Sequence, residues 1–142
     1  MAIPTNTAWL AAYLIVLQQV LMFAVGIYRG KNKHGMGIQG DITLERMVRR
    51  HGNLAENAGI FIASLGLLEI VAGSTSVVLF LCWTFAIART LHAIGFSSDY
   101  GAYKLDGQGF NRIFLISRAI GATVSGLSGV VCGIAIALAL AS

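Results

Sequence analysis

Charged residues are scarce in this chain. Lys, Arg, Asp and Glu together make up 11% of its 142 residues, against about 25% in a typical soluble domain. Hydrophobic residues make up 56%. This balance argues against a water-soluble protein and predicts an integral membrane protein. The length predicts a single domain over residues 1–142.

Several common signals of catalytic or metal sites are also missing. Cys82 and Cys132 both lie in apolar runs and form no C-x-x-C motif, so we expect small apolar packing residues rather than a metal site or a disulfide. The spacings of His34, His51 and His92 do not predict a zinc site. No G-x-S-x-G, Walker or Rossmann pattern is present.

Long apolar runs are what the sequence does contain. Four of them cover residues 8–28, 54–73, 77–96 and 110–141, and the strictly apolar part of the last is Ala119–Ala141. Each apolar part is close to the roughly 20 residues that cross a bilayer as a helix. No basic segment precedes the first run, which is about a full span long, so we interpret it as a retained helix and not a signal peptide. The expected fold is an all-α, integral membrane four-helix bundle.

The basic residues predict the orientation of this bundle. They gather in the connections after the first and third spans, whereas the N-terminal tail, the turn after the second span and the C-terminus have none. The positive-inside rule places both charged connections in the cytoplasm and both termini outside. Nucleic-acid binding is a weaker interpretation of the net charge of +4, because that charge is divided among several places. The Lys and Arg residues outside the interior of the spans are Arg29, Lys31, Lys33, Arg46, Arg49, Arg50, Lys104 and Arg112.

Ionisable residues also occur inside the spans. At about 1.5 Å per residue, Arg89 and Arg118 lie about 10 Å in from the cytoplasmic ends of their spans, and Glu56 lies only slightly inside its own. An arginine at the bilayer centre costs roughly 2.5–3.5 kcal/mol. We therefore expect Arg89 to face other helices, a carboxylate or an anionic ligand. A structural ion pair between Arg89 and Glu56 and a ligand site both remain open.

Helical spacing groups these residues into stripes. Arg49, Asn53 and Glu56 are spaced i, i+4 and i+7 and share a helix face, which Arg46, Arg50 and Asn57 extend sideways. In the third span, Arg89, His92 and Phe96 share a face at i, i+3 and i+7. If the stripes face each other, they form a basic pocket with one acid, open to the cytoplasm. Such a pocket suits a small anionic molecule with one ammonium group. The alternatives are that the arginines near the membrane surface are anchors and that His92 bonds a carbonyl in the core.

Small residues recur at every fourth position of the last span, which lets helices approach closely in lipid. This pattern predicts tight packing and an oligomer. Glu69, near the outer end of the second span, is expected to reach the membrane interface without a functional role. The small residues are Gly121, Ser125, Gly129, Gly133, Ala137 and Ala141.

The segment "ERMVRRHGNLAENAGIF" resembles the second-helix signature of the MAPEG family, membrane-associated proteins in eicosanoid and glutathione metabolism. The segments "LLEI", "ARTLHAIGF" and "SRAIGATVSG" extend the resemblance over nearly the whole chain. It implies a homotrimer similar to bacterial microsomal glutathione transferases, in the inner membrane with periplasmic termini. It also implies that glutathione binds in a cytoplasm-facing cleft between subunits and is used as cosubstrate against lipophilic electrophiles or lipid hydroperoxides.

The same resemblance implies roles for individual residues. Arg118 matches an arginine that polarises the thiol of glutathione, and Glu56 would bind the ammonium group. A neighbouring guanidinium favours the thiolate and lowers the thiol pKa from its usual value of about 8.5. The thiolate is the nucleophile. The residues implied to hold glutathione are Arg29, Arg49, Asn53, Glu56, Arg89 and His92.

Some positions depart from the family pattern. Phe96 stands where several active relatives have a tyrosine that contacts glutathione, Gly52 where some have an arginine, and Gly59 where proline is usual. Tyr100 and Tyr103, in a loop longer than in compact relatives, are candidates to replace the missing hydroxyl.

These departures keep a second interpretation open. Some family members bind lipids or partners without catalysis, so the chain is alternatively a non-catalytic scaffold or an accessory subunit of a larger membrane complex. The loop over residues 97–109 would then dock a cytoplasmic partner, and its length leaves open whether Arg118 or Arg112 matches the family arginine. A transporter or channel is less well supported, because the outer half of the spans lacks a polar path.

Overall fold

The computed structural model describes residues 3–98 and 111–141, and this part of the chain folds into four helices without strands. All four are long and apolar enough to cross a membrane. Over the described residues, the prediction of an all-α fold with four helices able to span a membrane is therefore confirmed. Tyr100 and Tyr103 lie outside the described residues. The helices are α1 (Thr5–Asn32), α2 (Ile42–Ala72), α3 (Ser76–Gly95) and α4 (Arg112–Ala141).

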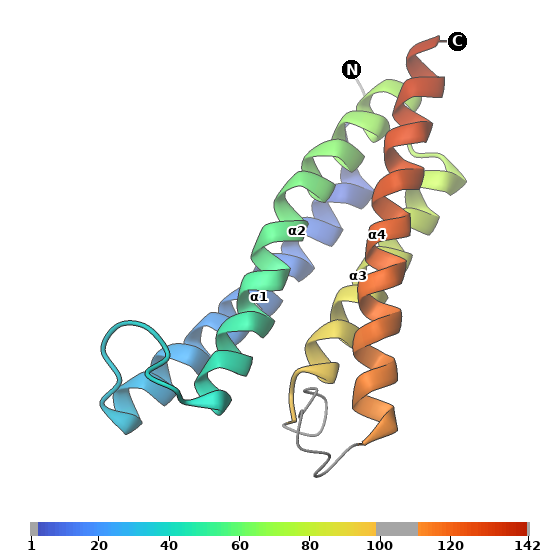
Figure 1. Cartoon of the computed structure of the whole chain (residues 1–142). Helices are drawn as coiled ribbons and strands as arrows, with labels where there is room; N and C mark the ends of the chain where they lie inside the picture. Colours follow the sequence, from blue (N-terminus) through green and yellow to red (C-terminus); the bar gives the residue numbers. More distant parts are fainter. Residues whose placement is uncertain (1–2, 99–110, 142) are drawn as a thin grey trace.

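The helices run alternately up and down. Both ends of the chain lie at one end of the bundle, and the α1–α2 connection lies at the opposite end (Figure 1). We call this second end the loop end. Large apolar side chains such as Trp9, Phe23, Trp83 and Leu138 are exposed on the outside of the bundle. In a bilayer, such side chains contact lipid.

Helix α2 begins well before its apolar run, at Ile42 and not near residue 54. Asp41 is the reason, because its Oδ1 accepts a 2.9 Å hydrogen bond from the backbone N–H of Leu44 and caps the helix. The 31 residues of α2 give it a length of about 46 Å, beyond the roughly 30 Å hydrocarbon core. The arginine-rich first turns of α2 therefore extend toward the loop end.

Helices α3 and α4 pack backbone to backbone. A Cβ atom added at Gly121 would come within 2.6 Å of the Ala88 carbonyl oxygen and of the His92 backbone nitrogen. A Cβ atom at Gly95 would come within 2.6 Å of the backbone nitrogen of Arg118. The two glycines set the register of the helix pair and place Arg118 beside the end of α3. The close packing expected from the small residues of α4 is thus confirmed at Gly121.

Glu69 does not reach the membrane interface, and that expectation is wrong. Its side chain is buried, with 0% exposure. Its carboxylate accepts hydrogen bonds from the backbone N–H groups of Asn6 and Thr7, at 3.0 and 2.8 Å, and from the hydroxyls of Thr7 and Ser74, at 2.7 and 2.8 Å. The first N–H groups of a helix lack partners within the helix. No side chain of α1 caps its own N-terminus. The Glu69 carboxylate, from α2, therefore serves as the cap for the first N–H groups of α1.

Candidate functional site

Three basic side chains, one each from α2, α3 and α4, contact Phe96 at the end of α3. Arg46 Nη1 donates a 2.8 Å hydrogen bond to the Phe96 carbonyl oxygen. The Arg118 Cζ lies 5.2 Å from the centroid of the Phe96 ring, and the His92 ring centroid lies 5.1 Å from it. Arg50 lies one turn after Arg46 on α2, and Arg89 lies one turn before His92 on α3. We call Arg46, Arg50, Arg89, His92 and Arg118 the basic cluster.

The deepest members of the basic cluster are sealed inside the protein. Arg89 is 3% exposed and His92 is 5% exposed. Arg89 Nε and His92 Nδ1 are buried without a hydrogen-bond partner among the described residues. A buried polar group without a partner costs about 1–3 kcal/mol. The carbonyl partner expected for a core histidine is not found within residues 3–98 and 111–141, so that interpretation of His92 is wrong.

No ion pair joins Arg89 to Glu56, and the structural interpretation of these two residues is also wrong. The one ion pair within the described ranges is the His34–Asp41 contact. Glu56 is exposed. Its Oε1 lies 3.9 Å from the position that a Cβ atom would take at Gly52, one turn earlier in α2. The carboxylate therefore lies along the outer face of α2, whereas Arg89 is buried.

Glu56 belongs to a polar stripe on α2, as the spacing predicted. Asn53 Nδ2 donates a 2.9 Å hydrogen bond to the carbonyl oxygen of Arg49, and Asn57 Nδ2 donates one of 2.8 Å to that of Asn53. Arg49, Glu56 and Asn57 are exposed, and Asn53 is half-buried. We call these four residues the α2 polar stripe. Its exposed groups are available to a ligand or a neighbouring chain.

The predicted convergence of Arg49, Arg89 and Arg118 is only partly seen in one chain. Arg118 is half-buried against Phe96, whose ring also lies close to His92. Arg49 is exposed and Arg89 is buried, so these two side chains do not line one open surface. Spacing along a helix predicted which residues share a face, but not how the faces of α2 and α3 turn toward each other.

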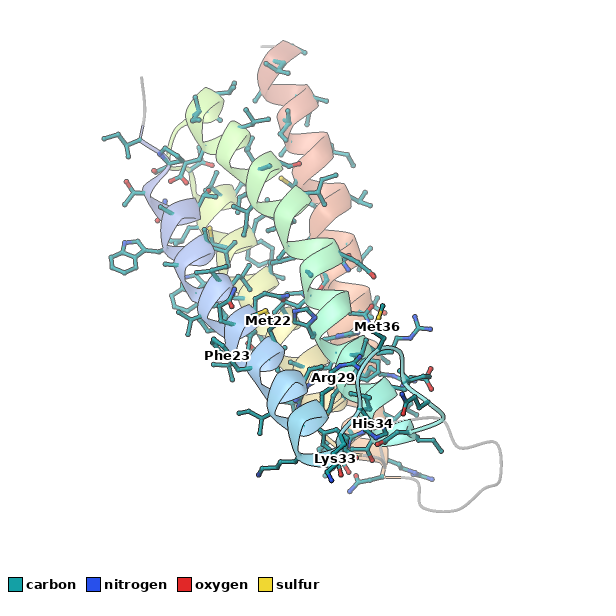
Figure 2. The ribbon with its side chains drawn as sticks, turned by 90° about the vertical axis from the view of Figure 1, so that its left-hand side faces the viewer. Met22, Phe23, Arg29, Lys33, His34 and Met36 are labelled. Carbon is teal, nitrogen blue, oxygen red and sulfur yellow. The ribbon has the colours of Figure 1, made fainter. Side chains whose placement is uncertain are left out.

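Arg29 lies at the loop end and holds the α1–α2 connection. Its Nη1 donates to the carbonyl oxygens of Gly35 and Gly37, at 2.8 and 2.9 Å. Figure 2 shows Arg29 beside this connection, together with Lys33, His34 and Met36. These hydrogen bonds of Arg29 belong to the connection and not to the basic cluster.

Asp41 organises the same connection. Its Oδ2 accepts a 3.0 Å hydrogen bond from the Tyr28 hydroxyl and lies 3.0 Å from His34 Nε2. The hydrogen bond from the Leu44 backbone N–H, followed by those of Tyr28 and His34, holds the pKa of Asp41 below its usual value.

A cavity of about 320 Å³ begins beside the α2 polar stripe and lies among α2, α3 and α4. Its lining includes Asn57, Ser64, Phe85, Gly129 and Cys132. A larger, mainly apolar cavity of about 650 Å³ lies between α1 and α3. The smaller cavity is the one that joins a polar group of the candidate site to the apolar interior.

Sequence reasoning placed Phe96 on one helix face with Arg89 and His92, but it did not connect Phe96 to Arg46, which it left as an anchor or an extension of the polar face of α2. The structure shows Phe96 in contact with Arg46, and both His92 and Arg118 lie close to its ring. The proximity of His92 and Phe96 follows from their spacing of four residues. The contact with Arg46 spans 50 residues of sequence and had no local signal.

Comparison with known proteins shows the family of the chain. The sequence profile of the MAPEG family matches residues 7–141. No curated protein and no solved structure matched the chain. Because the match covers nearly the whole length, the chain belongs to the MAPEG family.

Proposed function

We propose that this MAPEG protein is a glutathione-dependent membrane transferase or peroxidase that acts on lipophilic electrophiles. The observation that carries the proposal is that Arg50, Arg89 and Arg118 are buried or half-buried and have no counter-charge among the described residues. Within the described parts of the chain, no carboxylate lies within 4.0 Å of Arg50, Arg89 or Arg118. Charges held out of water without a partner are costly. A bound anion would remove this cost.

Glutathione has the matching chemistry, with two carboxylates, one ammonium group and a thiol. The basic cluster would bind the carboxylates, and the exposed Glu56 would bind the ammonium group. Arg118 would face the thiol and favour the thiolate. Lowering a thiol pKa by two units requires about 2.7 kcal/mol of differential stabilisation. The thiolate would then bond to the electrophilic carbon as the leaving group departs.

The geometry of one chain supports a site shared between subunits. Arg49, Glu56 and Asn57 of the α2 polar stripe are exposed, whereas Arg89 and His92 are buried in α3. A neighbouring subunit over the stripe would enclose Arg49 and Glu56 and complete a cleft that faces the cytoplasm. We therefore include a homotrimer in the proposal. Cross-linking in native membranes that yields trimers, and no larger or mixed species, is the expected result.

The cavity that starts at Asn57 is suited to the apolar reactant. Its volume of about 320 Å³ is roughly that of ten water-sized groups, at about 30 Å³ each. A lipophilic electrophile entering from the bilayer would place its apolar part there and its reactive carbon toward the polar stripe. This route gives a physical reason for the enzyme to reside in the membrane.

Orientation is part of the same proposal. With the two basic connections in the cytoplasm, both termini are periplasmic in a bacterial inner membrane. Topology reporters fused to either terminus should be active only in the periplasm. Reporters that show both termini in the cytoplasm would place the basic cluster on the side of the membrane away from cytosolic glutathione.

Purified protein tests the activity directly. We expect glutathione to bind in calorimetry and to be conjugated to an aryl halide, with turnover lost in Arg118→Ala. Lys31→Ala removes an equally charged but exposed side chain and should retain turnover. Wild-type protein that neither binds glutathione nor turns over would exclude the proposal.

Arg49 is exposed whereas Arg89 is buried. This difference also favours a second candidate function, a non-catalytic membrane scaffold. In that role the basic cluster would only hold α2, α3 and α4 together around Phe96. Isolation of the protein in a stable hetero-complex would support the scaffold, whereas isolation solely as a homotrimer with turnover would exclude it.

A further inference from the structure

Phe96 is fixed in position through its backbone. It follows the last residue of α3, and its backbone N–H donates a 3.3 Å hydrogen bond to the His92 carbonyl oxygen. Its own carbonyl oxygen accepts the 2.8 Å hydrogen bond from Arg46 of α2. Both polar groups of the Phe96 backbone are therefore held, and the direction of its side chain is set by two helices.

The backbone of Arg118 is fixed by the same helix end. Gly95 has no side chain, and an added Cβ atom would come within 2.6 Å of Arg118 N and Cβ. One turn further along α4, Gly121 contacts the His92 backbone equally closely. Because these contacts fix the register of α4, the remaining freedom of Arg118 is that of its own long side chain.

The Phe96 ring limits that freedom. The Arg118 Cζ lies 5.2 Å from the ring centroid, within the roughly 6 Å range of a cation–π contact. No carboxylate within residues 3–98 and 111–141 approaches this guanidinium to 4.0 Å. The contact with the ring is the specific interaction of the Arg118 head group in the described structure.

A ring and a carboxylate would hold a guanidinium in different ways. A carboxylate neutralises the charge and occupies N–H donors, of which arginine has five. The face of an aromatic ring attracts the charge and leaves the in-plane donors unoccupied. Holding Arg118 by an aromatic ring therefore preserves both its charge and its donors for an anion.

We propose that Phe96 is a positioning residue, whose ring holds the Arg118 guanidinium beside the ligand thiol while its N–H donors stay available. This inference rests on the proposed function, because the ligand in question is glutathione. In this proposal, the aromatic ring of Phe96 is the part of the residue that positions Arg118. A hydroxyl at this position is then not required for thiolate formation.

The test compares Phe96→Leu with Phe96→Tyr and measures the pH dependence of glutathione conjugation. Without the ring, the apparent thiol pKa should rise by about one unit, which lowers the thiolate fraction, and thus kcat, about tenfold below that pKa. The KM for glutathione should change less, because the carboxylates are bound elsewhere. Phe96→Tyr should keep the wild-type pH profile. Phe80→Leu, which removes an exposed ring far along α3, is the control.

Phe96→Met provides a second variant without a ring but with similar volume, for use if Phe96→Leu does not fold. An unchanged pH profile in a folded variant lacking the ring would overturn the positioning role while the proposed function stands. A wild-type protein that does not bind glutathione would overturn both. A changed profile in Phe96→Tyr would show that the ring alone is not sufficient and would also contradict the inference.

Discussion

Glu69 and Thr7 are joined by two hydrogen bonds to a single carboxylate oxygen. The Thr7 hydroxyl donates at 2.7 Å and the Thr7 backbone N–H at 2.8 Å. Hydrogen bonds to a charged group contribute roughly 1.5–3 kcal/mol each. The contact ties the start of α1 to the end of α2 inside the bundle.

Replacement of Glu69 should therefore destabilise the fold. We expect Glu69→Ala to lower the free energy of unfolding by about 2–5 kcal/mol, since it leaves the α1 N–H groups uncapped and buried. Thermal unfolding in detergent measures the change. Glu45→Ala removes a less buried carboxylate from the same helix and should change the midpoint much less. Equal midpoints for the two variants would contradict the capping role.

Replacement of Arg89 should stabilise the ligand-free protein and weaken glutathione binding. Its buried Nε has no partner among the described residues, so Arg89→Met should raise the free energy of unfolding of the ligand-free protein by roughly 1–3 kcal/mol. The same change should weaken glutathione binding at least tenfold. Calorimetry and thermal unfolding measure the two effects. A strong loss of stability without ligand would instead identify Arg89 as a structural residue.

Gly121 should tolerate no side chain. In Gly121→Ala the new Cβ would meet the Ala88 carbonyl oxygen and the His92 nitrogen at 2.6 Å. Overpacking of this kind costs about 1–3 kcal/mol. Gly133→Ala is the matched control, because it lies on the same helix with no atom within 4 Å of the added Cβ. Unfolding midpoints that fall equally for both would mean that the α3–α4 contact is not specific.

Gly129 should influence the choice of electrophile. It lines the cavity that begins at Asn57, so Gly129→Leu should fill part of that space. We expect kcat/KM to fall about tenfold for a bulky or long-chain electrophile and to stay nearly constant for a small aryl halide. Gly133→Leu controls for a larger side chain on α4. A uniform loss for all electrophiles would argue against binding in this cavity.

The α1–α2 connection should loosen in acid. The pKa of Asp41 is lowered in the folded protein, so its ionised form contributes stability that is complete above the unfolded pKa of about 3.9. That contribution declines as the pH falls through the lowered pKa of the folded state. Hydrogen exchange of the connection at pH 7 and pH 3 measures it. Asp41→Asn should exchange faster at pH 7 and show a smaller difference between the two pH values.

The sequence was sufficient for features that repeat along one helix. Apolar runs predicted the four spans, and the spacing of Arg49, Asn53 and Glu56 predicted their common face. It was not sufficient for relations between helices. Glu69 was assigned to the interface because nothing local marks the N–H groups of α1 as its partners. An ion pair between Arg89 and Glu56 was considered because the two residues lie at a similar depth. Depth does not determine the direction in which each side chain points.

At the candidate site, sequence reasoning missed contacts for the same reason, because they join different helices. Arg46 reads as an anchor from its position near the membrane surface, and only the packing of α2 against the end of α3 brings it to Phe96. The start of α2 at Ile42 depends on the Asp41 cap, a polar signal that a search for apolar runs ignores.

The carboxylate of Glu69 also has a counterpart at the opposite end of the bundle. Glu69 secures the α1 start and the Ser74 turn at the outer end, whereas toward the loop end the ribbons of α1 and α2 diverge from those of α3 and α4 (Figure 1). There the hydrogen bond from Arg46 to the Phe96 carbonyl oxygen spans the divergence. A polar contact between different helices therefore fastens each end of the bundle, one through a carboxylate and the other through a guanidinium.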